Sequence, residues 1–227
     1  MSTSEQPDEM VVIAIDGPAG SGKSTVAKLL AERVELPYLD TGAMYRSVTF
    51  ACIAAGIDPA DGDEAAEVAT SMELRMDPDG SVVVNGVDAT TQIRGPAVTR
   101  AVSSVASHPE VRKELVSRQR EWARRHGGGV LEGRDIGTVV FPDATLVVYL
   151  TASAEVRAAR RAGEVADLDY DTVAADIARR DAFDQNREVD PLKRADGATE
   201  IDTTYLTIEE VIEVLVRQLD AATDAGS

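Results

Sequence analysis

Cysteine, aromatic residues and long apolar runs are all scarce in this chain of 227 residues. The single cysteine, Cys52, has no partner within the chain, so an internal disulfide is excluded and a reducing cytoplasm is the expected location. No apolar run approaches the roughly 20 residues that span a bilayer, so we expect no membrane-spanning helix. Residues 1–10 are polar and acidic, without the basic and apolar regions of a signal peptide.

Positive charge is also scarce, and it is unevenly spread. The chain has 23 Lys and Arg against 40 Asp and Glu, a formal net charge of −17. Nucleic acid and anionic lipid repel such a chain, so neither is expected as a partner; an equally open interpretation is that the charge only maintains solubility. Nineteen of the basic residues are arginine, several of them in short clusters, which favours a local anion-binding site.

Apolar runs that alternate with helical patterns predict a parallel α/β sheet with helices on both faces. Residues 10–16 form a continuous, β-branched apolar run that is typical of a buried parallel strand. A glycine-rich turn follows, and residues 24–34 then have helical spacing. Further strands are expected at 37–40, 127–133, 145–150 and 198–203.

Capping residues and prolines mark the expected helix starts. Thr41 is expected to cap a helix that runs to about residue 55, and Ser153 can cap a later one. Thr207 and Glu210 have capping-box spacing ahead of an amphipathic C-terminal helix. Other helices are expected to start at Pro96, Pro109 and about Thr172.

Residues 72–94 depart from the alternating pattern. The segments ELRMD and SVVVNG flank a Pro-Asp-Gly turn, which predicts a β-hairpin. Antiparallel strands within an otherwise parallel α/β chain indicate a small inserted subdomain.

The segment from Gly17 to Ser24 fits the G-x-x-x-x-G-K-[ST] pattern of a phosphate-binding loop, with an apolar strand before it and a helix directly after. Glycines let the backbone bend around phosphates, and the helix start adds its positive dipole end. Lys23 can reach the β and γ phosphates of ATP, and Ser24 can ligate Mg²⁺. The residues expected to bind ATP in this loop are Gly17, Pro18, Ala19, Gly20, Ser21, Gly22, Lys23, Ser24 and Thr25.

A phosphate-binding loop alone does not name a reaction, because switches, motors and kinases share it. The guanine motif N-K-x-D is absent, and the only D-x-x-G, at residues 77–80, lies in the hairpin turn. A nucleotide-dependent switch therefore has little support, and a passive ATP-binding module would not need a second anion site.

Two segments could supply such a second site. Residues 40–46, DTGAMYR, form a glycine turn into a helix with Arg46 one turn in, which could hold a phosphate group or could be an ordinary helix start. Residues 132–135, EGRD, follow a core strand at the sheet edge where α/β proteins bind ligands. Glu132 could hold a magnesium-bound water there, or the segment could be a loop salt bridge.

Two arginine clusters each allow two interpretations, a binding role or a solvated surface. Arg180, Asp184 and Arg187 share one helical face if the helix continues that far, and could bind a phosphate and a sugar hydroxyl or form a surface ion-pair ladder. A second cluster on one helix face could close on ATP as a lid, or face solvent; its members are Arg157, Arg160 and Arg161. His108 and His126 lack metal-ligand spacing.

Together these motifs resemble those of bacterial cytidylate kinases. The matching stretches, in the family's order between about residues 11 and 219, are IDGPAGSGKST, LDTGAMYR, SSVASHPEVR, EGRDIGTVVFPDA and RRDAFDQNR. Departures from the family pattern are Thr41 in place of a frequent serine, and Phe183 and Gln185 in a stretch that is otherwise richer in arginine.

The resemblance implies an α/β P-loop nucleoside monophosphate kinase fold. Its core is a parallel five-stranded sheet flanked by helices, with an antiparallel β insert in the monophosphate-binding domain and a short lid. A single kinase domain, residues 1–227, is expected. Its implied parts are a core of 10–56, 127–152 and 171–222, a monophosphate-binding insert of about 57–108 and a lid of 153–170.

The reaction implied by the resemblance is transfer of the γ-phosphoryl group of ATP to CMP or dCMP, with Mg²⁺, in pyrimidine nucleotide metabolism. Another P-loop small-metabolite kinase and a non-catalytic ATP-dependent switch remain alternatives. A cytoplasmic monomer with no nucleic-acid or membrane partner is expected.

Residue roles also follow from the resemblance. Arg46 and Arg134 hold the CMP phosphate with Arg187 nearby, and Arg180 and Asp184 hold the ribose. The residues that read cytosine are Ser103, Arg112 and Asp135, and Thr41 belongs to the same substrate site. The residues implied in phosphoryl transfer are Lys23, Arg46, Arg134, Arg160, Arg161 and Arg187, with Arg157 on ATP.

Overall fold

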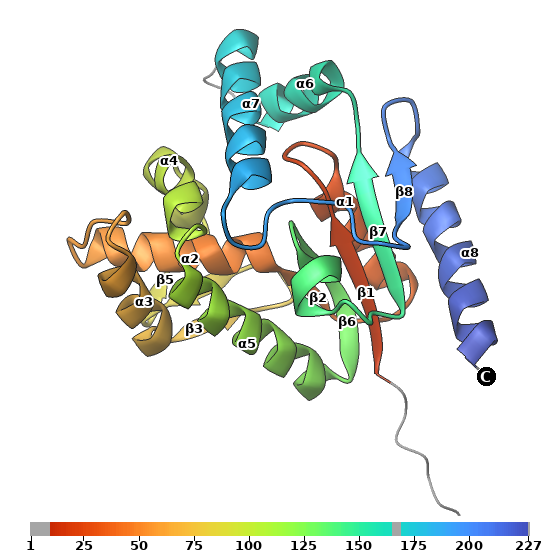
Figure 1. The fold of residues 1–227 in the computed structure, drawn as a ribbon, viewed down its shortest axis with the longest axis horizontal. Coiled ribbons are helices and arrows are strands. Elements are labelled where there is room, and N and C mark those ends of the chain that lie inside the picture. The colour runs from red at the N-terminus through yellow and green to blue at the C-terminus, as the bar shows by residue number, and fades with distance from the viewer. Residues whose placement is uncertain (1–9, 165–168, 227) are drawn as a thin grey trace, which may run out of the picture.

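A five-stranded parallel sheet forms the centre of the computed structural model, which describes residues 10–164 and 169–226. The strand order is β2-β6-β1-β7-β8 (Figure 1), and the predicted parallel sheet is confirmed. Each predicted core strand is confirmed to within about a residue. The strands are β1 (Val11–Asp16), β2 (Tyr38–Asp40), β6 (Gly128–Gly133), β7 (Leu146–Thr151) and β8 (Thr199–Asp202).

Helices cover both faces of this sheet because its strands are apolar on both sides. Val12 and Ala14 of β1 pack into a cluster with α2 (Thr41–Ala54) and α5 (Pro109–His126). Ile13 and Ile15 point to the opposite face, toward helices α1 and α8. The bounds of these last two helices are Lys23–Arg33 and Ile208–Gly226.

The expected antiparallel insert is present as a separate three-stranded sheet of order β3-β4-β5. The predicted turn lies between β3 (Leu74–Met76) and β4 (Val82–Val84), with Gly80 at φ 88°. Within the range predicted for the insert, about residues 57–108, the structure also has β5 (Val87–Asp88), the 3₁₀ turn η1 (Gln92–Arg94), α3 (Gly62–Ser71) and α4 (Pro96–Val105). The division of the chain into core, insert and lid stays a prediction.

Helices α6 (Ala154–Glu164) and α7 (Tyr170–Asn186) lie together beyond the carboxyl ends of the strands (Figure 1). One part of the predicted lid, residues 165–168, falls outside the described residues. α7 ends at Asn186, and Arg187 has a ψ of 134°, so the helical face expected for Arg180, Asp184 and Arg187 stops before its last member.

One capping prediction is wrong. Asp40, not Thr41, caps α2, since the Asp40 carboxylate accepts a hydrogen bond from the Ala43 amide at 2.9 Å. The Thr41 hydroxyl instead donates to the Glu132 carbonyl at 2.6 Å. The Thr207–Glu210 capping box is confirmed: the Glu210 amide donates to the Thr207 hydroxyl and the Thr207 amide to the Glu210 carboxylate.

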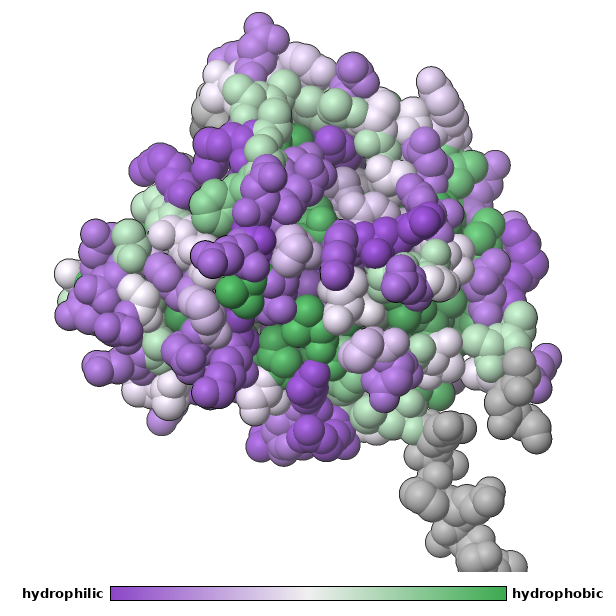
Figure 2. Space-filling view, viewed as in Figure 1, coloured by the Kyte–Doolittle hydropathy of each residue, from purple (hydrophilic) through white to green (hydrophobic). Residues whose placement is uncertain are grey.

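Hydrophilic side chains cover most of the face seen in Figure 2, with apolar residues in smaller areas between them. Within residues 10–164 and 169–226, no helix combines the length and the apolar character required to pass through a bilayer.

Candidate active site

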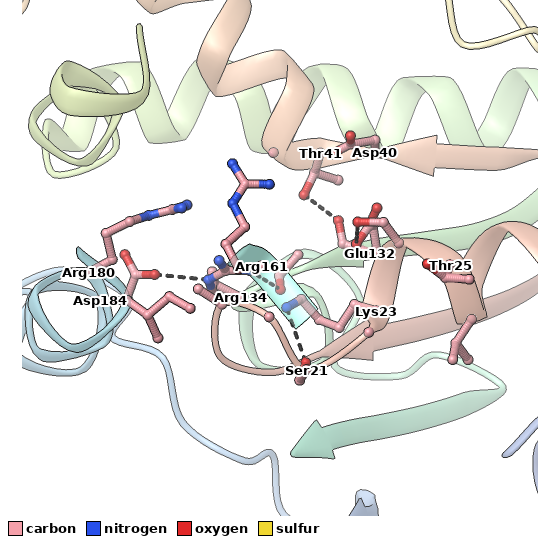
Figure 3. Close-up of a pocket in the computed structure, with 18 of the residues that line it drawn as sticks. Ser21, Lys23, Thr25, Asp40, Thr41, Glu132, Arg134, Arg161, Arg180 and Asp184 are labelled. Carbon is pink, nitrogen blue, oxygen red and sulfur yellow. Dashed lines mark hydrogen bonds and ion pairs between the residues drawn. The ribbon is translucent and has the colours of Figure 1, made fainter. Parts of the chain in front are cut away.

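A cavity of about 510 Å³ opens at the carboxyl ends of the central strands. Among the described residues, nine basic and five acidic side chains line it, although the whole chain has a net charge of −17. This local excess of positive charge makes the cavity suited to a polyanion. Figure 3 shows Lys23, Thr41 and Glu132 on one side and Arg134, Arg180 and Asp184 on the other.

The glycine-rich loop forms one wall because its backbone takes conformations that other residues rarely adopt. Gly20 and Gly22 have φ angles of 75° and 88°. At Gly17, a Cβ atom would lie 2.0 Å from the Leu150 carbonyl oxygen, so only glycine fits against β7. α1 begins at Lys23 directly after the loop, which directs the amides of its first turn at the cavity.

The Lys23 side chain is buried in this wall. Its Nζ donates to the Pro18 carbonyl oxygen at 2.7 Å and lies 3.4 Å from the Ser21 hydroxyl. Burial and the nearby Arg134 guanidinium lower the pKa of Lys23, and the Glu132 carboxylate opposes that shift. A bound phosphate would supply the counter-charge that favours the ammonium form.

Glu132, at the end of β6, connects the loop wall to β2. Its carboxylate accepts from the Ser24 hydroxyl at 2.9 Å and from the Tyr38 hydroxyl at 2.5 Å. Burial, together with the charge of Asp40, raises the pKa of Glu132. The adjacent hydroxyl and carboxylate oxygens are the hard ligands that Mg²⁺ prefers.

Arg46 projects from α2 into the cavity, as the DTGAMYR segment predicted. Its guanidinium donates to the Thr99 hydroxyl at 3.1 Å and to the Ile93 carbonyl at 3.3 Å. Burial, and then the repulsion from Arg180, lowers the pKa of Arg46 to about 10. The guanidinium groups of Arg46 and Arg180 have few counter-charges nearby, so together they can bind an anion.

Arg112 and Asp135 form a buried ion pair deeper in the cavity. Arg112 is 2% exposed, and its guanidinium carbon lies 5.7 Å from the centre of the Tyr45 ring. Burial raises the pKa of Asp135, and the positive charge of Arg112 opposes the rise. Ser103, from α4, lines the same region.

The α7 residues lie across from the glycine-rich loop (Figure 3). Asp184 accepts from Arg134 Nε at 2.9 Å, so its counter-ion comes from the end of β6 and not from its helical neighbours. Arg180 lines the cavity beside them, and burial lowers its pKa. Asp184 is buried, which excludes the interpretation of this segment as a solvated surface ladder.

The arginine trio of α6 is divided between two roles. Arg160 and Arg161 line the cavity, and Arg160 donates to the Thr203 hydroxyl at 2.9 Å and to the Thr203 carbonyl at 2.7 Å. Arg157 forms an ion pair with Asp181 of α7 and donates to the Ala19 carbonyl at 3.0 Å.

Asp181 and Arg157 together hold the loop residue Ala19 through both of its backbone groups. Asp181 accepts from the Ala19 amide at 3.1 Å, while Arg157 donates to its carbonyl. The Ala19 methyl group packs against Ala158, Val173 and Ile177 of the same two helices. The glycine-rich loop is therefore attached directly to α6 and α7.

The comparisons with known proteins agree with this geometry. The family model described as cytidylate kinase matches residues 13–221. The chain belongs to the cytidylate kinase family. It is 51% identical to a cytidylate kinase of Mycobacterium avium, an alignment that covers 90% of this chain and 93% of the relative. It is also 51% identical to a cytidylate kinase of Geobacillus kaustophilus, over 89% and 93% of the two chains.

A solved structure shows the fold alone. The match is a gluconokinase from Sinorhizobium meliloti, with a TM-score of 0.50 and 13% identity over 96% of this chain and 95% of the other. At that identity the match shows a shared architecture and carries no information about the substrate.

The cavity of this cytidylate kinase family member brings most of the predicted site residues together. Gly17, Pro18 and Arg157 lie outside the lining that the described residues form. The predicted residues that line it are Ala19, Gly20, Ser21, Gly22, Lys23, Ser24, Thr25, Thr41, Arg46, Ser103, Arg112, Glu132, Arg134, Asp135, Arg160, Arg161, Arg180, Asp184 and Arg187.

Several supporting residues were missed by sequence reasoning. Asp16, at the end of β1, accepts from the Ile136 and Gly137 amides at 2.8 Å each, which fixes the turn after Asp135. Burial raises the pKa of Asp16 to about 6. Its position as a polar residue ending an apolar strand was the available signal. The other missed residues are Tyr38, Tyr45, Arg94, Asp181, Asp190 and Thr203.

Proposed function

We propose that this chain transfers the γ-phosphoryl group of ATP to CMP or dCMP, giving ADP and CDP or dCDP. The observation that carries the proposal is a single cavity with two anion-binding sides, in a member of the cytidylate kinase family. A switch or a passive ATP-binding module would need only the glycine-rich side.

ATP is assigned to the side formed by the glycine-rich loop. The loop amides and Lys23 would bind its phosphates. Leu206, Ile208 and Val211 line the same cavity and offer an apolar surface to the base. Mg²⁺ would be held by the Ser24 hydroxyl and, through water, by Glu132, and would supply charge neutralisation at the phosphates. The described residues contain no group of three or more His, Cys, Asp or Glu that could form a protein-only metal site.

CMP is assigned to the opposite side. Arg46 and Arg134 would hold its phosphate, with Arg187 nearby, and Arg180 and Asp184 would hold the ribose. The cytosine site would comprise Ser103, Arg112 and Asp135. Thr41, at the start of α2, would also contribute to the CMP site from the side of Glu132, whose carbonyl accepts its hydroxyl.

The chemistry requires positioning and charge stabilisation and no covalent intermediate. The CMP phosphate is already an anionic nucleophile near neutral pH, so no strong general base is assigned. Lys23, Arg160 and Arg161 line the cavity where negative charge would develop during transfer. Closure of the predicted lid would exclude water, so that ATP is not hydrolysed.

A coupled ADP-release assay against CMP, dCMP, UMP and AMP tests the function. ADP release that depends on CMP or dCMP supports it. Release with an unrelated small metabolite would favour another P-loop kinase, and slow ATP hydrolysis without an acceptor would favour a switch.

Base selection is tested at Asp135. Cytosine presents an amino donor where uracil presents an acceptor, so a carboxylate distinguishes them, and an unpaired buried acceptor costs roughly 1–3 kcal/mol. Asp135→Ala is expected to narrow the ratio of kcat/KM for CMP over UMP by about tenfold. If both substrates lose activity equally, Asp135 only pairs with Arg112. The cytoplasmic location and monomeric state stay predictions.

A further inference from the structure

Asp190 lies in the turn that follows α7 and is outside the cavity lining formed by the described residues. Its carboxylate accepts from Arg112 Nε at 2.8 Å. Its backbone carbonyl accepts from Arg187 Nη2 and lies 3.1 Å from Arg187 Nε, which also donates to the Val189 carbonyl at 2.9 Å. One residue therefore holds both a cavity arginine assigned to the base and a cavity arginine assigned to the phosphate.

The turn itself is built around an uncommon conformation. Asp190 has a φ of 49°, in the left-handed region that non-glycine residues seldom adopt, and the following Pro191 restricts it further. The turn is anchored after Asp190, where Leu192 is buried and its amide donates to the Asp184 carbonyl at 2.8 Å. Such a conformation persists only where the surroundings fix it, and here the surroundings include two cavity arginines.

The pairing also determines which donors of Arg112 remain for a substrate. Asp190 takes Nε, and Asp135 takes one terminal nitrogen. The other terminal nitrogen has a long contact of 3.4 Å with the Ala106 carbonyl. The charge of the Arg112 guanidinium is balanced by two carboxylates, those of Asp190 and Asp135. Asp135 therefore keeps lone pairs that can accept a hydrogen bond from a base.

We propose that Asp190 is a positioning residue for the nucleoside monophosphate: it holds Arg112 through its carboxylate and Arg187 through its carbonyl, in one rigid turn. This inference rests on the proposed function, because it assigns those two arginines to CMP. It acts on the monophosphate side alone, since the glycine-rich loop makes none of these contacts.

The test compares Asp190→Gly with Asp190→Asn. Glycine accepts the φ of 49° and keeps the carbonyl but removes the carboxylate, whereas asparagine keeps a side-chain acceptor and removes the charge. We expect Asp190→Gly to raise KM for CMP about tenfold and Asp190→Asn to raise it less, with KM for ATP unchanged within about twofold. Asp196→Asn, in the exposed loop that follows, is the matched control.

A double variant distinguishes an effect of Asp190 on the position of Arg112 from a general effect on folding. If Asp190 acts through Arg112, Asp190→Gly should change KM for CMP little in an Arg112→Ala background. An unchanged KM for CMP in Asp190→Gly, or equal rises for CMP and ATP with a lowered Tm, would overturn the inference. The proposed function itself would be overturned if the wild-type protein neither bound CMP in calorimetry nor phosphorylated it. The results for the Asp190 variants bear only on the role of Asp190.

Discussion

The two walls of the cavity bind anions by different physical means. The loop wall, residues 19–25, presents backbone amides from a glycine-rich turn and a helix start. The arginine wall presents guanidinium groups from α5, the end of β6, α7 and the turn after it; its members are Arg112, Arg134, Arg180 and Arg187. Amides carry no net charge and need no counter-ion, whereas buried guanidinium groups repel one another.

Two of these four arginines have carboxylate partners. Arg112 pairs with Asp135 and Asp190, and Arg134 pairs with Asp184. Removing a partner from such a pair leaves a buried charge without compensation and is more damaging than loss of a surface ion pair. Anion binding at the loop wall should consequently depend on where the loop backbone is held. Anion binding at the arginine wall should depend on the carboxylates that pair with its arginines.

The largest effect is expected from the one charged side chain of the loop wall. Lys23→Ala should lower kcat by about 100–1000-fold, because an ammonium group that stabilises the transferring phosphoryl group is lost. Lys28→Ala, on the exposed face of the same helix, is the control and should keep normal kcat. Near-normal turnover in folded Lys23→Ala would contradict the assignment of ATP to this wall.

Asp16 connects the walls, because it ends β1 before the loop and holds the turn that follows Asp135. Its pKa is raised to about 6 in the folded state, so the folded protein binds its proton more tightly than the unfolded chain does. Its contribution to stability is thus present below about pH 4 and is lost as the pH rises through 6.

Urea unfolding of wild type and Asp16→Asn at pH 4.5 and 7 measures this contribution. The free energy of unfolding of wild type minus that of the variant should decrease as the pH rises, by roughly 3 kcal/mol at most. Asp143→Asn, exposed in the next loop, should show no such trend. A difference that increases with pH would contradict the raised pKa.

Asp181 connects the loop wall to α6 and α7 through Ala19. Asp181→Asn should raise KM for ATP about tenfold, because the ion pair with Arg157 that holds the loop is lost, while KM for CMP changes less than twofold. Arg157→Met should act in the same direction, and the double variant should add little. Asp171→Asn, exposed on the same helix, is the control. Equal effects on both substrates would mean that the pair only supports the fold.

The smallest effect is expected outside both walls. Asp61 caps α3 in the insert, and its carboxylate accepts from the Asp63 and Glu64 amides at 3.1 and 3.0 Å. Asp61→Ala should lower the free energy of unfolding by about 1 kcal/mol, as is usual for a lost N-cap, and leave kcat and both KM values unchanged. A large loss of activity would show that the insert is coupled more tightly to the cavity than its contacts indicate.

Local chemistry let the sequence determine the sheet, the insert hairpin and the loop wall. An apolar strand, a glycine turn and a helix start are adjacent in the chain, so their pattern predicted their structure. The N-cap of α2 could not be predicted in the same way. Asp40 and Thr41 are both good caps, and the choice was made by Glu132, whose carbonyl is 91 positions away and takes the Thr41 hydroxyl.

The tertiary structure alone decided the partners of the charged residues. A spacing of four residues suggested that Asp184 pairs along its helix, but burial against the end of β6 gives it Arg134 instead. Arg157 likewise faces Asp181 and the loop backbone. Sequence patterns predict which residues share a face of one element, because that depends on local periodicity. Which opposite charge meets each of them depends on the packing of distant elements, where desolvation favours the nearest buried counter-ion.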